Sequence, residues 1–287
     1  GICNRHIAKD MDNADMAYNA ARNAVEDARI EASKIGLIIV ATSTPDYAFP
    51  NQASLVQAKL KAVNAMCFDV SAACSGFITA MDIAASMYKY ALVIGSEKMS
   101  EIVNWKDRSV CVLFGDGAGA VVLKAVDNNT EDVTGALVGH ERGIIDSNIY
   151  NDGTGASVLT GGRRFSDSCS TDIFIHMDGQ EVFKFAVKSV PTAIETLLHN
   201  NNMDINEVDK FILHQANVRI IESVAKRLKA DKDKFPVNLN EYGNTSSASI
   251  PILLDELNRN GSLKQGEKLV LAGFGAGLSW GSILLVW

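Results

Sequence analysis

An extended run becomes an apolar helix at Asp69-Val70-Ser71-Ala72-Ala73-Cys74-Ser75-Gly76-Phe77. The residues up to Val70 predict a strand, and the residues from Phe77 to Met87 predict a helix. Cys74 is therefore expected at a helix N-terminus, where N–H groups without partners favour negative charge and lower the pKa of a thiol. Because its neighbours are small, a substrate can approach, and Cys74 is a candidate nucleophile. The competing interpretation is a small buried core residue.

Two further segments end in polar side chains at comparable places. A short apolar strand over residues 208–215 carries His214 near its end, and a turn containing Asn244 leads into a helix over residues 248–259. Singly, such a histidine is more often structural and such an asparagine more often a cap. In open α/β sheets, however, reacting groups gather at the ends of strands. Cys74, His214 and Asn244 together supply a nucleophile, a base or donor, and an amide donor.

The composition limits the class of protein. The chain has 287 residues, 47% hydrophobic and 21% charged, which allows a sizeable core in one large domain or two fused ones. A net charge of −7 argues against nucleic acid as a partner. Five cysteines without regular spacing predict neither a disulfide framework nor a metal site, and they fit a reducing cytoplasm. No signal peptide is visible. The cysteines expected to be structural are Cys3, Cys67, Cys111 and Cys169.

The uncharged C-terminal stretch needs its own explanation. Residues 269–287 carry no charge and are long enough for a membrane span. They also contain Gly273, Gly275, Gly277 and Gly281, and no basic flank follows them. The favoured interpretation is a strand, a glycine turn and a second strand within a core, so no membrane is expected as a partner.

The chain reads as two similar halves. In each half a strand, a Gly-x-Gly-x-Gly stretch and a second strand are predicted, over residues 109–123 and 269–286. A duplicated unit predicts two related layers packed against each other. We expect halves of residues 1–128 and 129–287, joined at the polar stretch 127–132. Because no helix directly follows either glycine stretch, a dinucleotide site is not predicted.

The region between residues 140 and 172 is rich in Gly, Ser, Asp and Asn, and it includes Gly161-Gly162-Arg163-Arg164. This composition predicts a long irregular connection. Such a connection in a compact domain is often a lid or binding loop, and the alternative is a solvated loop without a role.

The motifs resemble one known family, the β-ketoacyl-acyl-carrier-protein synthase III enzymes, which start bacterial type II fatty-acid synthesis and belong to the thiolase superfamily. The resemblance covers nearly the whole chain. Each motif is weak alone, but their order and combination are specific. The motifs are Gly1-Ile2 with Arg5-His6-Ile7-Ala8, Ala48-Phe49-Pro50, Ser71-Ala72-Ala73-Cys74-Ser75-Gly76-Phe77, Phe114-Gly115-Asp116-Gly117-Ala118-Gly119-Ala120, Met177-Asp178-Gly179-Gln180-Glu181-Val182-Phe183-Lys184, His214-Gln215-Ala216-Asn217-Val218-Arg219, Gly243-Asn244-Thr245-Ser246 and Phe274-Gly275-Ala276-Gly277-Leu278-Ser279-Trp280-Gly281.

The resemblance implies an α/β, thiolase-like fold in which two pseudo-duplicated halves form five layers, αβαβα. It also implies a ping-pong Claisen condensation. Cys74 would take a short acyl group from acyl-coenzyme A, and decarboxylation of malonyl-acyl-carrier protein would supply the attacking carbanion. His214 and Asn244 would be donors to the enolate oxygen, and the N–H groups of Cys74 and Ala276 would form the oxyanion hole. The coenzyme A thioester is a substrate, and no metal or other cofactor is required.

The resemblance further implies a coenzyme A site and a homodimer. Phe49 would cross the dimer interface and cap the acyl pocket of the partner; the alternative for Phe49 is ordinary loop packing. The residues implied to contact coenzyme A or its pantetheine arm are Arg108, Leu113, Gly179, Phe183, Asn217 and Arg219.

A basic stripe follows His214 on the next predicted helix. Arg219, Lys226, Arg227 and Lys229 fall on one side at helical spacing, and apolar residues fall on the other. Such a stripe is usually a solvated face. In a protein of net charge −7 it also suits docking of an acidic carrier protein, with Lys184 extending the patch, and we favour that interpretation.

The sequence departs from the family pattern in two places, and two alternative functions remain. The chain starts inside a Thr-Gly-Ile-Arg-like motif, and only Tyr88-Lys89 separates a predicted helix from the strand that begins at Tyr90. These features suggest that an N-terminal segment carrying part of the coenzyme A site, and a loop, precede or interrupt the sequence. The nearest alternative function is a polyketide or quinolone-type starter condensing enzyme, and a non-catalytic carrier-protein binding module is a more distant one.

Overall fold

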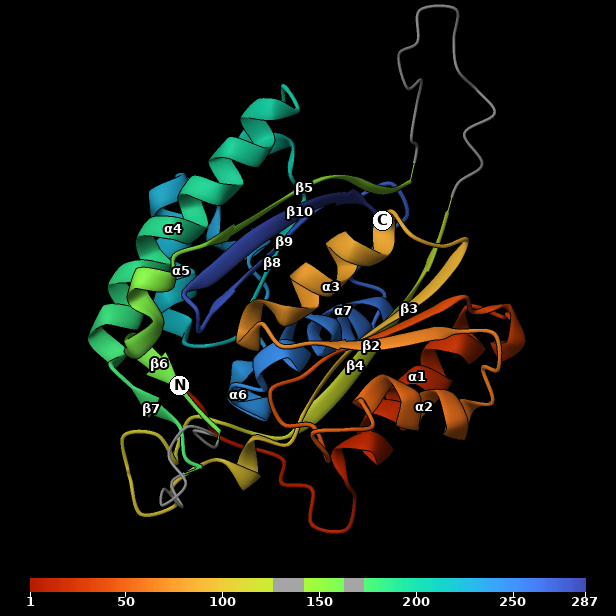
Figure 1. The fold of residues 1–287 in the computed structure, drawn as a ribbon. Helices are drawn as coiled ribbons and strands as arrows, with labels where there is room; N and C mark the ends of the chain where they lie inside the picture. The colour runs from red at the N-terminus through yellow and green to blue at the C-terminus, as the bar shows by residue number, and fades with distance from the viewer. Residues whose placement is uncertain (126–141, 163–172) are drawn as a thin grey trace, which may run out of the picture.

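The computed structural model describes residues 1–125, 142–162 and 173–287, and two four-stranded sheets dominate it (Figure 1). The first sheet contains, in spatial order, β2 (Met66–Val70), β1 (Leu37–Ala41), β3 (Tyr90–Glu97) and β4 (Gly117–Lys124). β1 pairs in parallel with β2 and β3, whereas β4 runs antiparallel to β3. Every residue of β1 is buried, as expected for a parallel strand with both faces covered.

The second sheet repeats this plan. It contains, in spatial order, β5 (Gly143–Asn151), β10 (Ser279–Val286), β9 (Lys268–Gly275) and β8 (Lys210–Leu213). β8 and β9 are parallel, and β10 is antiparallel to β9 just as β4 is to β3. The uncharged stretch at the C-terminus thus forms a strand, a glycine turn and a strand, as predicted. In the described segments no helix is long and apolar enough to cross a membrane.

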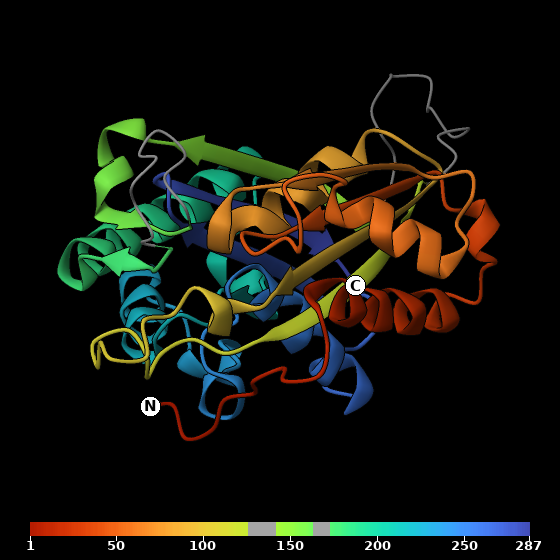
Figure 2. The ribbon, with the colours of Figure 1, turned by 60° about the horizontal axis from the view of Figure 1, so that its bottom comes forward.

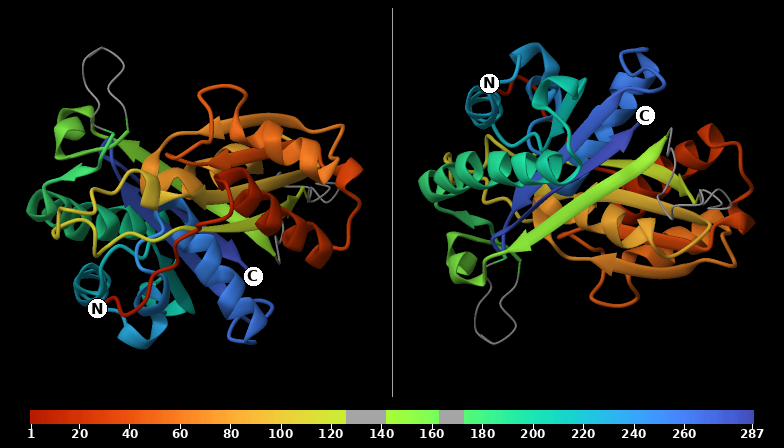
Figure 3. Two further views of the ribbon diagram at one scale, coloured as in Figure 1. Left: turned by 90° about the horizontal axis from the view of Figure 1, so that it is seen from below. Right: turned by 90° about the horizontal axis from the view of Figure 1, so that it is seen from above.

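Helices fill the space between the sheets and cover both outer faces (Figures 1 and 3). α3 (Gly76–Ala85) lies between the sheets, touching β1 and β3 on one side and β9 and β10 on the other, and α7 (Ser249–Arg259) lies beside it. α1 (Asn13–Asp27) and α2 (Gln52–Leu60) cover the first sheet. α4 (Gly179–Asn200) and α5 (Val218–Leu228) cover the second. The result is the αβαβα thiolase-like architecture that the family resemblance implies.

The central core joins the two halves. It contains apolar side chains from both sheets together with those of α3 and α7, so neither half buries its inner face without the other. Gly95 on β3 shows how close the packing is, because a Cβ there would clash with the carbonyl oxygen of Ser247. The carboxyl end of β3 therefore meets the segment that leads into α7.

Two local predictions are wrong. Residues 109–113 form turns rather than a strand, and the strand that pairs with the first glycine stretch is β3. Residues 143–151, predicted to be irregular, form the edge strand β5, whose register comes from pairing with β10. The two short strands β6 (Leu159–Thr160) and β7 (His176–Met177) also pair in this region.

Several predictions fall on residues 126–141 and 163–172, which lie outside the described part of the chain. These are the junction at residues 127–132, the boundary between residues 128 and 129, Arg163, Arg164 and Cys169. The division into residues 1–128 and 129–287 stays a prediction.

The N-terminal segment runs alongside the loop between β3 and β4 (Figure 2). The backbone N–H of Asp116 donates to the carbonyl of His6 at 2.8 Å, and the Asp116 carboxylate accepts from the N–H of Ala8 at 2.8 Å. The ring of His6 also stacks on Tyr242 at a centroid distance of 5.3 Å. Residues of the N-terminal motif therefore support the loop next to the candidate site.

Candidate active site

Cys74 lies where the sequence predicts, between a strand and a helix. β2 ends at Val70, a single 3-10 turn spans Ala73–Ser75, and α3 begins at Gly76. The residue before the thiol, Ala73, has a φ of 45°, a left-handed conformation that is uncommon for a residue with a side chain and is often found at active sites. The Cys74 S–H donates to the hydroxyl of Ser246, with Sγ and Oγ 3.4 Å apart.

The glycine turn between β9 and β10 closes against the Cys74 backbone. A Cβ on Gly275 would lie 2.8 Å from the Cys74 nitrogen, so only glycine permits this approach. Ser279 ties the turn down, since its hydroxyl donates to the carbonyl of Ala276 at 2.8 Å and lies 2.6 Å from the Ser75 hydroxyl. Ala276 is thus in the turn beside the thiol, which supports its place in the oxyanion hole. That role itself stays a prediction.

The acidity of the thiol differs from the sequence-based expectation. Cys74 is buried, and burial raises its pKa to about 12 despite the hydrogen bond to Ser246, which lowers it. The expected lowering by the helix N-terminus is therefore wrong for this closed site, because removing water from around a thiolate outweighs the helix end. An ionised carboxyl on Glu97 would raise the pKa of Cys74 further.

His214 follows β8 and is almost completely buried. Burial lowers the pKa of its imidazole to about 3, so the ring is neutral at pH 7. Its Nδ1 lies 2.6 Å from the hydroxyl of Ser249, at the start of α7. That hydroxyl also accepts from the N–H of Gln215 at 3.3 Å and has one proton that it can donate to Nδ1. When it does so, the proton of the neutral His214 ring is on Nε2.

Asn244 is held by backbone on both sides. Its N–H donates to the carbonyl of Leu113 at 2.9 Å, and its carbonyl accepts from Gly115 at 3.0 Å. Its side-chain Oδ1 accepts from the N–H of Ser246 at 2.8 Å. Since Oδ1 is committed to the backbone, the amide can offer its Nδ2 hydrogens to a substrate.

One short stretch connects all three predicted catalytic residues. We call residues 244–249 the serine segment: it contains Asn244, contacts Cys74 through Ser246, and contacts His214 through Ser249. Sequence reasoning missed both serines. It also missed Glu97, the buried acid at the end of β3, although an acid that ends an apolar strand is a visible signal.

The residues predicted to bind coenzyme A occupy several surfaces. Leu113 is half-buried and joins the site directly through the Asn244 backbone. Arg108 is exposed in the loop between β3 and β4. Gly179 and Phe183 lie in the first turns of α4, exposed and half-buried respectively. Their contacts with coenzyme A stay predictions.

α5 is amphipathic as predicted. It buries Ile220, Ile221, Val224, Ala225 and Leu228 and leaves its basic residues exposed. Asn217 caps the helix, because its side chain accepts from the N–H of Arg219 at 2.9 Å. Arg227 reaches toward α4, where Nη1 lies 3.4 Å from the Val187 carbonyl. Lys184 on α4 pairs with Glu181 at 2.7 Å, which weakens its contribution to a basic patch.

Phe49 lies in the loop between β1 and α2, and 86% of it is exposed. A phenylalanine this exposed is not packed into its own loop, so ordinary loop packing does not describe it. The outer edge of β2 in the same half has no strand partner within the described residues.

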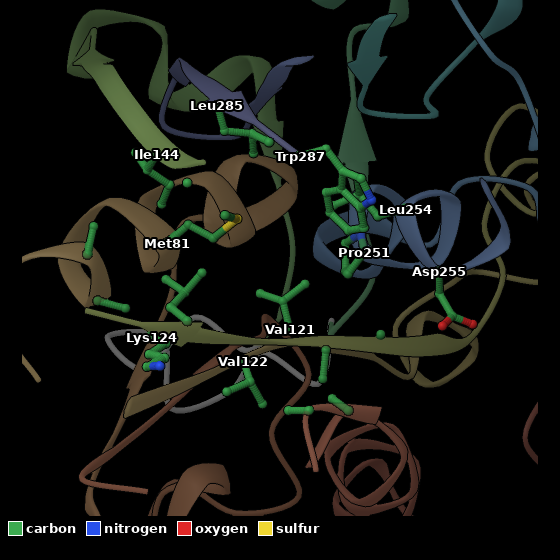
Figure 4. Close-up of a pocket in the computed structure, with 18 of the residues that line it drawn as sticks. Met81, Val121, Val122, Lys124, Ile144, Pro251, Leu254, Asp255, Leu285 and Trp287 are labelled. Carbon is green, nitrogen blue, oxygen red and sulfur yellow. The ribbon is translucent and has the colours of Figure 1, made fainter. Parts of the chain in front are cut away.

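A cavity of about 1620 Å³ lies away from these residues, along the outer edge of β4 (Figure 4). It is lined by Val121 on β4, Met81 on α3, Leu254 on α7 and Trp287 at the C-terminus. None of Cys74, His214 and Asn244 lines it. In the second sheet the equivalent edge, that of β10, is covered by β5. Within the described residues, the cavity therefore follows from a sheet edge without a strand partner and not from the candidate active site.

Known proteins resemble the chain along its whole length. A family model described as 3-oxoacyl-[acyl-carrier-protein (ACP)] synthase III matches residues 68–153, and one for the C terminal part of that enzyme matches residues 198–287. A β-ketoacyl-[acyl-carrier-protein] synthase III of Clostridium botulinum is 45% identical over 299 residues, which cover 100% of this chain and 88% of the relative.

Solved structures agree with these matches. The 3-oxoacyl-[acyl-carrier-protein] synthase III of Aquifex aeolicus has a TM-score of 0.89 and 43% identity, covering 99% of this chain and 87% of that one. The priming β-ketosynthase of the R1128 polyketide pathway has a TM-score of 0.88 and 34% identity, covering 98% and 84%. The identities of 45% to the Clostridium botulinum enzyme and 43% to the Aquifex aeolicus enzyme exceed the 34% to the polyketide enzyme, so the polyketide alternative is not favoured.

Proposed function

This chain belongs to the 3-oxoacyl-[acyl-carrier-protein] synthase III family, and from that premise we propose that Cys74, His214 and Asn244 carry out the family reaction. The enzyme is an acyltransferase that performs the initiating condensation of fatty-acid synthesis. The observation that carries the residue assignment is the serine segment, which links the thiol, the imidazole and the amide through Ser246, Ser249 and Asn244.

The first half-reaction is acyl transfer to Cys74. Its sulfur attacks the thioester carbonyl of a short acyl-coenzyme A, a carbon–sulfur bond forms, and coenzyme A leaves as the free thiol with the proton that Cys74 gives up. The N–H groups of Cys74 and Ala276 stabilise the oxyanion; a donor of this kind contributes about 2.7–4 kcal/mol in comparable enzymes.

The second half-reaction uses malonyl-acyl-carrier protein. Loss of carbon dioxide leaves an enolate, whose carbon attacks the acyl-cysteine and releases 3-oxoacyl-acyl-carrier protein and the Cys74 thiolate. The negative charge on the enolate oxygen is stabilised by uncharged hydrogen-bond donors. A neutral His214 with its proton on Nε2, and the Nδ2 of Asn244, supply them.

We extend the proposal to the assembly and its surroundings. The exposed Phe49 and the open edge of β2 support a homodimer in which Phe49 caps the partner's acyl pocket. The basic face of α5 supports docking of the carrier protein.

Free cysteines at Cys3, Cys67 and Cys111 support a reducing cytoplasm. The proposed chemistry uses no metal or other cofactor.

The assignment of the nucleophile is tested by trapping. Wild-type protein incubated with radiolabelled acetyl-coenzyme A is expected to carry the label on the peptide containing Cys74. Cys74→Ser is expected to lose acyl transfer and to keep its melting temperature, because serine has nearly the same shape but is a far weaker nucleophile at neutral pH. More than a few per cent of transfer left in the variant would place the nucleophile elsewhere. A panel of acyl-coenzyme A primers then identifies chain length and branching.

A further inference from the structure

Glu97 ends β3 and is completely buried, yet the reaction above makes no use of it. Its partners within the described residues are hydroxyl and N–H groups, and none is a cation. Oε2 contacts the Ser43 N–H at 2.9 Å and the hydroxyls of Thr44 at 2.9 Å and Thr42 at 3.4 Å. Oε1 contacts the hydroxyls of Ser246 at 2.9 Å and Ser247 at 3.1 Å. The neighbouring Lys98 is committed to Glu101 at 3.0 Å.

The protons of the groups around Glu97 show that its Oε2 is a hydrogen-bond acceptor. An N–H group such as that of Ser43 can only donate. The Thr44 hydroxyl already accepts from the N–H of Lys98 at 2.8 Å, so its proton is available for Glu97. Both the Ser43 N–H and the Thr44 hydroxyl therefore donate to Oε2, and this oxygen does not carry a proton.

The contacts of Ser247 favour a proton on Oε1. The Ser247 hydroxyl has a single proton, which lies toward the carbonyl of Ala41 at 2.8 Å and toward Oε1 at 3.1 Å. A carbonyl cannot donate in return, so an ionised Oε1 would have to share this proton with the Ala41 carbonyl. A proton on Oε1 makes the 3.1 Å contact a separate hydrogen bond to the Ser247 oxygen. Burial raises the pKa of Glu97 and outweighs the hydrogen bonds that lower it.

We propose that Glu97 is a positioning residue that is protonated on Oε1 and controls, through Ser246, the hydrogen bond received by the sulfur of Cys74. In the resting thiol, the S–H donates to Ser246 Oγ, and Ser246 donates to Oε1. When the sulfur becomes anionic, Ser246 turns its proton toward the sulfur, and the Oε1 proton moves its hydrogen bond from Ser247 to Ser246. An ionised Glu97 would instead retain the Ser246 proton and repel the thiolate.

The proposal rests on Cys74 as the nucleophile, but its test does not depend on turnover. The readout is the rate of Cys74 alkylation by iodoacetamide at a fixed pH well below the pKa of the thiol, where the rate follows the thiolate fraction; it is measured on the Cys74 peptide by mass spectrometry. Glu97→Gln keeps a neutral donor and an acceptor of the same shape. It is expected to leave the alkylation rate within about twofold of wild type. A rate raised about tenfold would show that a negative charge had been removed, and would overturn the proposal.

Two adjacent serines provide the matched pair. Ser246→Ala removes the donor to the thiolate and is expected to slow both Cys74 alkylation and acetyl transfer about tenfold. Ser247→Ala is the control, because Ser247 contacts the same Oε1 but its hydroxyl also donates to Ala41. It is expected to leave the alkylation rate unchanged. Equal changes of rate in the two variants would reduce the network to a packing role and contradict the proposal.

A measurement on the wild-type protein remains decisive if Glu97→Gln does not fold. Infrared spectroscopy of protein carrying isotope-labelled glutamate is expected to show one protonated carboxyl band at neutral pH. A spectrum containing carboxylate bands only would overturn the proposal. Because this band is independent of catalysis, it separates failure of the Glu97 assignment from failure of the proposed function, which acetyl labelling of Cys74 tests.

Discussion

At the scale of single residues, His214 and Asn244 are placed to act on the second substrate. Among the described residues, the hydrogen-bond partner of the Cys74 sulfur is Ser246, and neither His214 nor Asn244 takes that place. His214→Ala and Asn244→Ala are therefore expected to slow malonyl decarboxylation at least about a hundredfold, the size of effect of one lost oxyanion donor. Burst acylation from acetyl-coenzyme A should survive in both. Loss of both half-reactions to the same degree would contradict this division of roles.

The buried His214 also predicts how stability depends on pH. Its pKa is lowered from 6.5 to about 3 by burial, so below pH 6.5 the unfolded chain binds a proton that the folded chain excludes. The contribution of neutral His214 to the free energy of unfolding is fully present above pH 6.5 and is lost as the pH falls toward 3. Between pH 6.5 and 4.5 the loss is about 2–3 kcal/mol, at about 1.36 kcal/mol per pH unit.

Urea unfolding of wild type and His214→Gln at pH 7 and pH 4.5 measures this loss. The variant cannot titrate at this position, so its free energy of unfolding should fall less between the two pH values. Other titrating groups contribute equally to both proteins and cancel in the comparison. If the free energy of unfolding falls equally in both proteins between pH 7 and pH 4.5, His214 is protonated in the folded protein at pH 4.5.

At the scale of elements, α5 presents a basic face next to the candidate site. Charged rims act mainly through the association rate and are screened by salt, with a Debye length of about 8 Å at physiological ionic strength. Lys226→Glu on α5 is therefore expected to raise the KM for malonyl-acyl-carrier protein several-fold and to reduce its rise with salt. The KM for acetyl-coenzyme A should not change.

The matched control for α5 is Lys34→Glu, an exposed lysine before β1 in the other half of the chain. It makes the same change in net charge without altering α5. If both variants change the KM equally, the effect is one of overall charge, and the α5 face is an ordinary solvated surface.

At the scale of the whole molecule, Phe49 is expected to contribute to a dimer. Buried aromatic anchors often cost 2 kcal/mol or more when removed from an interface. Phe49→Asp is therefore expected to weaken self-association at least about tenfold, measured by sedimentation velocity at micromolar protein. Val237→Asp changes another exposed apolar residue, in the second half, and should leave association unchanged. A wild-type protein that sediments as a monomer would contradict the dimer.

The sequence by itself determined the features that depend on local pattern. Four features were readable: the Cys74 junction, the strand before His214, the turn at Asn244 and the C-terminal strand, glycine turn and strand. Each is specified within about ten to twenty residues by periodicity and small residues. The motif order also sufficed for the family, and with it the layered fold.

Only the tertiary structure decided the features that depend on contacts between segments far apart in the sequence. Residues 143–151 form β5 because β10 supplies the hydrogen bonds that this polar segment does not specify for itself. Ser246 lies 172 residues from Cys74, so neither their contact nor the role of Glu97 can be read from spacing. The direction of the pKa of Cys74 was mispredicted for the same reason. The helix end is a local feature, but the burial that outweighs it comes from the packing of the two halves.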